Sequence, residues 1–166
     1  MFGQLQTELG PLVIRLWQFS AALPLALAAC GGGRVAPSGV QPGSSAQAAV
    51  QAFLRAVADS NISAMSSLWG TSSGPALATG KPADYEKRMV VAQLFLRGAP
   101  YKIAGESAVE GESTQRRINV EFDRGRCTKA VPFVVLRLKE GGWIVTQIDL
   151  NSAGSPGRAC DPAQSQ

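Results

Sequence analysis

The spacing of apolar residues changes twice along the chain. Residues 16–29 are almost continuously apolar, residues 45–96 carry apolar side chains at helical spacing, and after Pro100 apolar and polar residues alternate. Helical spacing gathers apolar side chains on one face of a helix, whereas alternation gathers them on one face of a strand. The pattern therefore predicts an apolar leader, then helices, then a β-sheet.

Two helices are predicted in the region that begins at Ser45. The first begins after Ser45, a good N-cap, and its apolar positions continue to about Asp59. The second is short and carries Trp69 near its end, with Asn61 or Ser63 as its cap.

A loop and a third helix are predicted next. Residues 70–81 are rich in glycine and serine, which is typical of a loop. Pro82 suits the first position of a helix, and Gly98 with Pro100 ends the apolar pattern that follows it.

Four strands follow the helices. The third is apolar on both faces, which predicts a central position in the sheet, and Glu140-Gly141-Gly142 is a strong hairpin signal before the fourth. Helices followed by antiparallel strands predict an α+β fold, with the helices packed on one face of the sheet. The predicted strands are Tyr101–Val109, Thr114–Asp123, Ala130–Lys139 and Trp143–Leu150.

The apolar run at residues 16–29 has the length of a signal-peptide core. It falls short of the ~20 residues that span a bilayer, and Arg15 lies directly before it. It ends in Leu27-Ala28-Ala29-Cys30-Gly31, which resembles the lipobox of bacterial lipoproteins. The resemblance implies that the chain is cut before Cys30 and acylated on that cysteine. An ordinary secretory signal and a buried apolar helix are the alternatives.

Two further expectations concern this leader. Residues 1–12 contain no Lys or Arg, so the precursor is predicted to start near Val13. Gly31, rather than Asp, follows the cysteine, and by family analogy this favours the outer membrane facing the periplasm of a two-membrane bacterium. The acyl chains would then anchor the protein, because each buried methylene contributes ~0.8 kcal/mol.

Composition divides the chain into four parts. Glycine, proline and serine dominate after Cys30, which predicts a flexible spacer of about 20 Å root-mean-square reach. The parts are a signal peptide (1–29), the lipidated cysteine with its linker (30–45), an α+β domain (46–151) and a C-terminal tail (152–166).

The order of elements resembles the nuclear transport factor 2-like, cystatin-like cone fold. The helix 49–57, the polar break at Asp59-Ser60-Asn61, the second helix ending at Trp69 and the hairpin 140–145 carry the resemblance. It implies a pocket between the helices and a curved sheet. Candidate wall residues are Trp69, Tyr85, Phe95, Phe133 and Trp143, whose alternative role is ordinary core packing.

The resemblance predicts a binding or interaction module for a small apolar ligand or an envelope protein. Ketosteroid isomerases and polyketide cyclases share the fold, so a small pocket enzyme is the alternative. Asp149 would then be the carboxylate base and Tyr85 its partner, although neither lies at a spacing that demands catalysis. The sequence assigns no catalytic residue.

Composition narrows the chemistry. The chain contains no histidine, which removes histidine-dependent catalysis and imidazole metal sites. The net charge of +4 comes from scattered residues with few aromatic neighbours, a pattern that does not favour nucleic-acid binding. No metal or cofactor is predicted.

The lipobox resemblance also guides the interpretation of the other two cysteines. If Cys30 carries lipid, Cys127 and Cys160 remain as an even pair in an oxidising compartment. A disulfide between them would close a loop of about 34 residues and stabilise the fold by ~3–4 kcal/mol. Two free thiols are the alternative.

Overall fold

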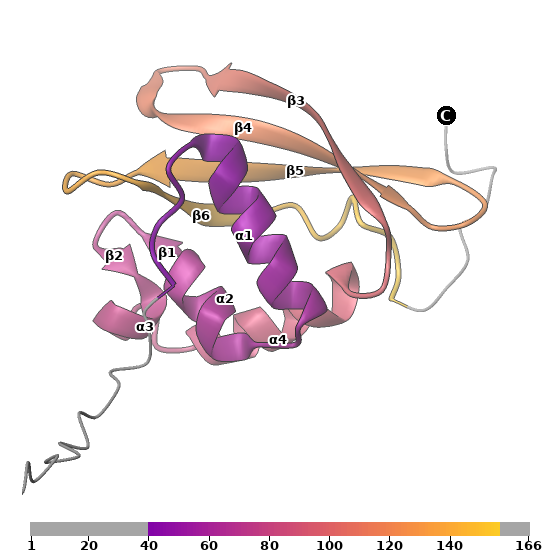
Figure 1. The fold of residues 1–166 in the computed structure, drawn as a ribbon, viewed down its shortest axis with the longest axis horizontal. Helices are drawn as coiled ribbons and strands as arrows, with labels where there is room; N and C mark the ends of the chain where they lie inside the picture. Colours follow the sequence, from indigo (N-terminus) through magenta and orange to yellow (C-terminus); the bar gives the residue numbers. More distant parts are fainter. Residues whose placement is uncertain (1–39, 157–166) are drawn as a thin grey trace, which may run out of the picture. The chain divides into compact units, whose positions relative to one another are not determined.

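The computed structural model describes residues 40–156 as a layer of helices beside a four-stranded antiparallel sheet (Figure 1), which confirms the α+β class. The helices precede the main strands in the chain, as predicted. The helices are α1 (Ala46–Ala58), α2 (Ile62–Leu68), α3 (Ala76–Thr79) and α4 (Tyr85–Leu96). The strands are β1 (Gly70–Thr71), β2 (Gly74–Pro75), β3 (Tyr101–Val109), β4 (Glu112–Asp123), β5 (Thr128–Arg137) and β6 (Trp143–Ile148).

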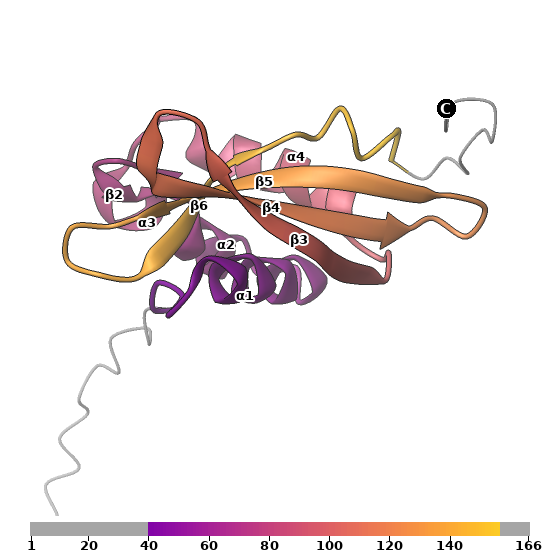
Figure 2. The same ribbon diagram turned by 90° about the horizontal axis from the view of Figure 1, so that it is seen from above.

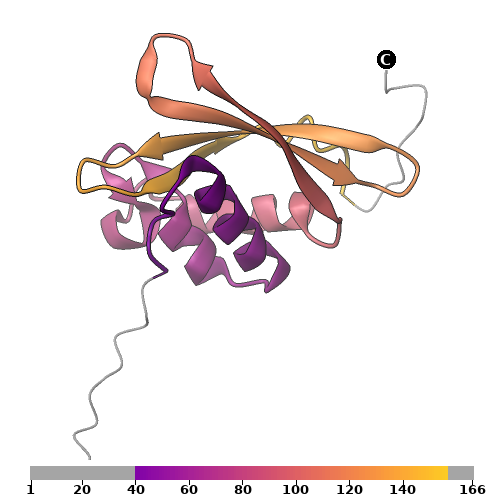
Figure 3. The same cartoon turned by 45° about the horizontal axis from the view of Figure 1, so that its top comes forward.

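The main sheet has the order β3-β4-β5-β6, and each neighbouring pair is antiparallel. The predicted central position of β5 is confirmed. In β4, Ile118, Val120 and Phe122 are fully buried, whereas Asn119 and Glu121 between them belong to the opposite face. The core therefore lies between one face of the sheet and the helices, which gather on that side (Figure 3).

Pro132 lies within the interior strand β5, yet the sheet loses no hydrogen bond there. Its carbonyl accepts a hydrogen bond from Asp149 N (3.0 Å), one residue beyond the end of β6. Its nitrogen, which has no hydrogen to donate, points to the same side of the strand. The proline thus lies where the neighbouring strand has already ended, which is the place an interior strand tolerates one.

Helix α1 is the main apolar support of the sheet. The hydroxyl of Ser45 accepts a hydrogen bond from Ala48 N (3.1 Å), so the predicted cap is confirmed. Its buried face contacts β4, β5 and β6, and Phe53 packs edge-on against Phe133 of β5 with ring centroids 6.4 Å apart. Seen from above, α1 and α4 lie on the two sides of the helix layer, and α2 contacts both (Figure 2).

Residues 70–81 are not the loop that their composition predicted. They form the small sheet β1–β2 and the short helix α3. The reason is tertiary, because Trp69 pairs with Val145 of β6 in a parallel bridge and its carbonyl accepts a hydrogen bond from Ala76 N (2.8 Å). These contacts fix Trp69 and Ala76, on either side of β1 and β2, in a segment that has no strong local preference.

The start of the third predicted helix is also corrected. Pro82 lies outside α4, which begins at Tyr85, and the carbonyl of Pro82 accepts a hydrogen bond from Tyr85 N (3.0 Å). Of the two caps proposed for α2, the structure uses Asn61, whose side-chain oxygen accepts a hydrogen bond from Ala64 N (2.9 Å). Trp69 follows α2 in extended conformation.

The residues that precede α1 already contact the main sheet. Gly43 exchanges two backbone hydrogen bonds with Trp143 of β6, at 2.8 and 2.9 Å. Gly142 at the neighbouring hairpin has a positive φ of 80°, and a Cβ there would come within 2.7 Å of the Cβ of Pro42. Glycine is therefore required at Gly142, which lets the entering chain lie against the β5–β6 hairpin.

Candidate ligand-binding groove

An open groove of about 470 Å³ lies between α4, the end of β6 and Trp69. Its volume is in the range of small-molecule sites. The apolar part of its lining is formed by Trp69, Met89, Val91, Ala92, Ile148 and Leu150.

Trp69 is held at the groove by the backbone. It is the C-cap of α2 in extended conformation, and it pairs with Val145 at the edge of β6. Only 7% of Trp69 is exposed. The groove is thus built on a side chain whose position depends on both a helix end and a strand edge.

Helix α4 carries apolar residues on two sides, one buried and one exposed. Met89, Ala92 and Leu96 are buried in the core, while Val90 and Leu94 are 52% and 46% exposed. Val91 is 45% exposed and lines the groove. The helix therefore carries more apolar surface than its contacts with the core require.

Charged side chains complete the groove on the α4 side. Asp84 and Arg88 form an ion pair of 3.0 Å, and the hydrogen bond from Arg88 lowers the pKa of Asp84 below its ordinary value. Lys87 also lines the groove and has no ion-pair partner among residues 40–156. The polar part of the lining thus contains one unpaired cation beside a neutralised pair.

Of the aromatic residues predicted as pocket walls, Trp69 lines this groove. Phe133 is fully buried in the core, and Tyr85, Phe95 and Trp143 are half-buried and pack against it. The Tyr85 hydroxyl contacts Glu86 (3.3 Å), and desolvation, with a smaller effect of Glu86, raises the pKa of Tyr85. These side chains are large enough to fill the core between sheet and helices.

Asp149 is placed differently from the base of an isomerase. It is exposed and lines a hollow with Arg117 and Asn119, which belong to the sheet face away from the core. Its carboxylate accepts a 2.6 Å hydrogen bond from the Ser152 hydroxyl, which lowers the pKa of Asp149. A buried carboxylate base has a raised pKa instead. The geometry therefore gives the enzyme alternative no support.

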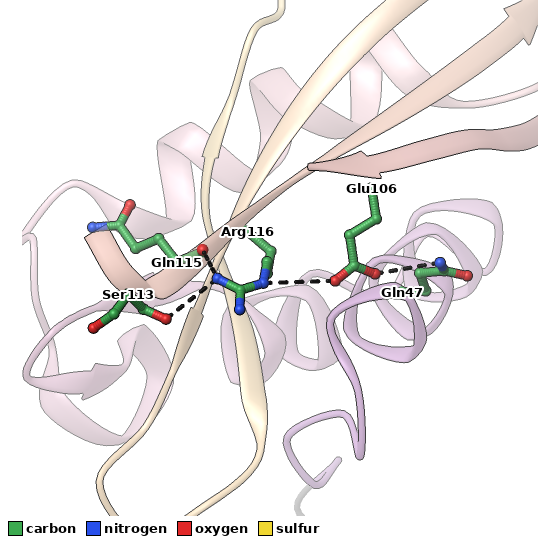
Figure 4. Close-up of polar contacts among 5 residues, drawn as sticks. All are labelled: Gln47, Glu106, Ser113, Gln115 and Arg116. Carbon is green, nitrogen blue, oxygen red and sulfur yellow. Dashed lines mark hydrogen bonds and ion pairs between the residues drawn. The ribbon is translucent and has the colours of Figure 1, made fainter. Parts of the chain in front are cut away.

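A second polar group joins the start of α1 to the β3–β4 end of the sheet (Figure 4). Gln47 Nε2 donates a hydrogen bond to Glu106 (3.3 Å), and Glu106 lies 3.9 Å from Arg116 Nε. Arg116 also donates to the carbonyls of Gln115 (2.8 Å) and Ser113 (3.3 Å). Because these polar groups form hydrogen bonds and an ion pair with one another, we interpret the cluster as a structural link between α1 and the sheet.

Arg124, in the β4–β5 loop, contacts the C-terminal end of α4. Its Nη2 donates a hydrogen bond to the carbonyl of Phe95 in the last turn of the helix, and its guanidinium lies 5.7 Å from the ring centroid of Phe122. Burial lowers the pKa of Arg124. A cation at this position also complements the helix dipole.

The predicted cysteine sites lie mostly beyond the described chain. Cys30 and Cys160 are outside residues 40–156, so lipidation and the Cys127–Cys160 disulfide stay predictions. Cys127 lies in the β4–β5 loop, where its carbonyl accepts a hydrogen bond from Arg124 N (2.9 Å).

Two general findings concern residues 40–156. No group of three or more Cys, Asp or Glu side chains in this range could hold a metal ion. None of the helices in the same range is long and apolar enough to cross a membrane.

No family model, curated protein or solved structure matches the chain.

Sequence reasoning missed most of the groove. Met89 and Ala92 belong to the apolar pattern from which the third helix was predicted, but nothing indicated that Ile148 and Leu150 would lie in the same groove. One signal was present, because residues 85–96 carry more apolar side chains than one helical face holds.

Proposed function

We propose that this chain is a bacterial lipoprotein, cut before Cys30 and held by its acyl chains at the surface of an envelope membrane. The lipobox-like Leu27-Ala28-Ala29-Cys30 at the end of an apolar run supports this location. We place the protein in the outer membrane facing the periplasm if the source bacterium has two membranes.

We further propose that the domain belongs to the nuclear transport factor 2-like type. The order of helices followed by four antiparallel strands agrees with the resemblance seen in the sequence. So does the placement of α1, α2 and α4 on one side of the sheet, with an open groove between a helix and a strand.

The function we propose for this domain is binding of a small apolar ligand in the α4–β6 groove. The observation that carries the proposal is the apolar lining of a hollow open to solvent, to which the exposed Val91 and the half-buried Ile148 and Leu150 contribute. Covering such exposed apolar surface with a ligand favours binding by about 25 cal/mol per Å² of apolar surface removed from water. Lys87 would favour a ligand that carries a negative charge.

An envelope protein is the second candidate occupant. Val90 and Leu94, exposed on α4 beside the groove-lining Val91, favour it. A ligand inside the groove and a protein across α4 would use different side chains, so substitutions can separate the two.

The binding proposal predicts unequal effects for two neighbouring valines. Val91→Glu places a carboxylate in the apolar lining and should weaken binding of the neutral fluorophore N-phenyl-1-naphthylamine by at least about tenfold. Val90→Glu is the matched control, because Val90 is as exposed as Val91 but does not line the groove. Fluorescence titration of the folded variants measures both.

The outcomes of this titration separate the candidates. Equal binding by the wild-type chain and Val91→Glu would contradict the ligand proposal. If Val90→Glu and Leu94→Glu instead abolish capture of one envelope protein by the full chain, while the fluorophore still binds, the protein partner is favoured.

The location is tested by Cys30→Ser. We expect the wild-type chain to incorporate labelled fatty acid and to fractionate with membranes, and Cys30→Ser to do neither, because the acyl chains supply the anchoring free energy. Cys127→Ser is the control and should label like the wild type. Labelling of Cys30→Ser would refute lipidation at this position.

A further inference from the structure

A second apolar surface lies where the described chain begins. We name it the Val40–Leu77 patch; it surrounds a hollow of about 310 Å³ whose lining contains no charged side chain. Val40 is 39% and Leu77 44% exposed. The patch consists of Val40, Pro42, Pro75, Leu77 and Ala78, with Gln41 and Ser67 completing the hollow.

The backbone holds Leu77 outward. Ala76 is fully buried and donates its N–H to the carbonyl of Trp69 (2.8 Å), so α3 is fixed by its first residue. The next two residues, Leu77 and Ala78, are exposed. At the other end, Gly80 closes the helix in the left-handed conformation, with φ 64°. The exposure of Leu77 therefore follows from the turn and not from a loose chain.

The position of the patch relative to the anchor follows from chain length, and this step rests on the proposed function. Ten peptide units separate Cys30 from Val40, which limits their distance to about 35 Å. Val40 is itself part of the patch. An acylated Cys30 would therefore keep the patch close to the lipid surface.

We propose that the Val40–Leu77 patch docks on the surface of the lipid bilayer into which the acyl chains of Cys30 insert. Contact with lipid needs little free energy of its own, because the anchor makes the encounter intramolecular. Five side chains are too few for a stable protein interface, which uses roughly 20–30 residues on each side. Docking would orient the domain and turn the β4–β5 loop, at the opposite end of the sheet in Figure 1, away from the membrane.

The test uses the full acylated protein in phosphatidylcholine vesicles with phosphatidylglycerol added in one arm. A photoreactive p-benzoylphenylalanine replaces Leu77 in one variant and Arg126, an exposed residue of the β4–β5 loop, in the control variant. After illumination, lipid adducts are counted by mass spectrometry. We expect at least about fivefold more lipid adduct at position 77 than at position 126, in both lipid mixtures, because apolar contact carries the docking.

Every other result overturns the proposal. Equal adducts at both positions would mean that the domain has no fixed orientation, and protein adducts at position 77 would give the patch another partner. The intact mass of the same samples distinguishes failure of the patch proposal from failure of the proposed location. An acylated Cys30 without lipid adducts at position 77 removes the patch proposal alone, whereas an unacylated Cys30 removes the proposed location as well.

A second measurement does not depend on the photoreactive residue. Leu77→Asp should speed the rotational motion of the vesicle-bound domain in time-resolved anisotropy, because a charge at this position opposes contact with the bilayer interior. Val90→Asp, at a position outside the patch that is at least as exposed as Leu77, is the control and should leave the motion unchanged. Unchanged motion in Leu77→Asp would contradict docking through the patch.

Discussion

Helices α1 and α4 differ in how they use their apolar residues, although they have similar lengths of 13 and 12 residues. Helix α1 buries seven residues on one face, and its N-terminus is capped by the side chain of Ser45. Helix α4 buries three, exposes Val90, Val91 and Leu94, and has no side-chain cap bond. The difference indicates that α1 contributes more to the core, whereas α4 leaves more apolar surface exposed, which we propose a ligand or partner covers.

The largest predicted effect separates the two helices by stability. Phe53→Ala in α1 removes a fully buried ring that packs on Phe133, so the free energy of unfolding should fall by ~3–5 kcal/mol. Leu94→Ala in α4 removes a side chain that is 46% exposed and should change it by no more than ~0.5 kcal/mol. Urea unfolding measures both. Similar losses would mean that Leu94 is covered by something in the folded protein.

The helix caps give a smaller contrast. Ser45→Ala removes a side chain that accepts a hydrogen bond from Ala48 N and should cost about 1 kcal/mol. Asp84→Ala removes no cap bond and only an exposed ion pair, so its cost should be clearly below that of Ser45→Ala. A larger cost for Asp84→Ala would show that α4 depends on its first turn more than α1 does.

The smallest predicted effect is a pH dependence at the start of α4. The pKa of Asp84 is lowered in the folded protein, mainly by the hydrogen bond from Arg88, so the ionised form is favoured by folding. Its stabilising contribution is present above the unfolded pKa and is lost as pH falls through the lower folded pKa, below about pH 4. NMR titration of the Asp84 carboxyl checks this. A folded pKa at or above the ordinary value would contradict the role of Arg88, and Arg88→Gln should bring the pKa back up.

The sequence predicted most of the main sheet and of α1 because their signals are local. Ile118, Val120 and Phe122 alternate with polar residues, and Ser45 precedes a helical apolar face, so each pattern specifies its element without distant contacts. Strand β3 has the predicted bounds, and the other three differ by at most two residues at either end. The hairpin at Gly141 and Gly142 was likewise predicted, and both glycines have positive φ.

Residues 70–81 and the groove could not be predicted in the same way. The two-residue strands β1 and β2 form beside a bridge between Trp69 and Val145, residues far apart in sequence. The groove requires Trp69, α4 and the end of β6 at once, and only Trp69 was predicted as a wall. Phe133 shows the opposite error, because a large aromatic side chain that could line a pocket instead fills the core.

A native mass spectrum of the protein, purified from membranes of its producing bacterium, tests the proposed anchor and the proposed groove together. We expect a chain that begins at Cys30, carries the mass of acyl chains, and retains a small molecule that Val91→Glu loses and Val90→Glu keeps. A chain that still contains residues 1–29 with an unmodified Cys30 would contradict the anchoring. An acylated chain that carries the same molecule in the wild type and in Val91→Glu would contradict the groove.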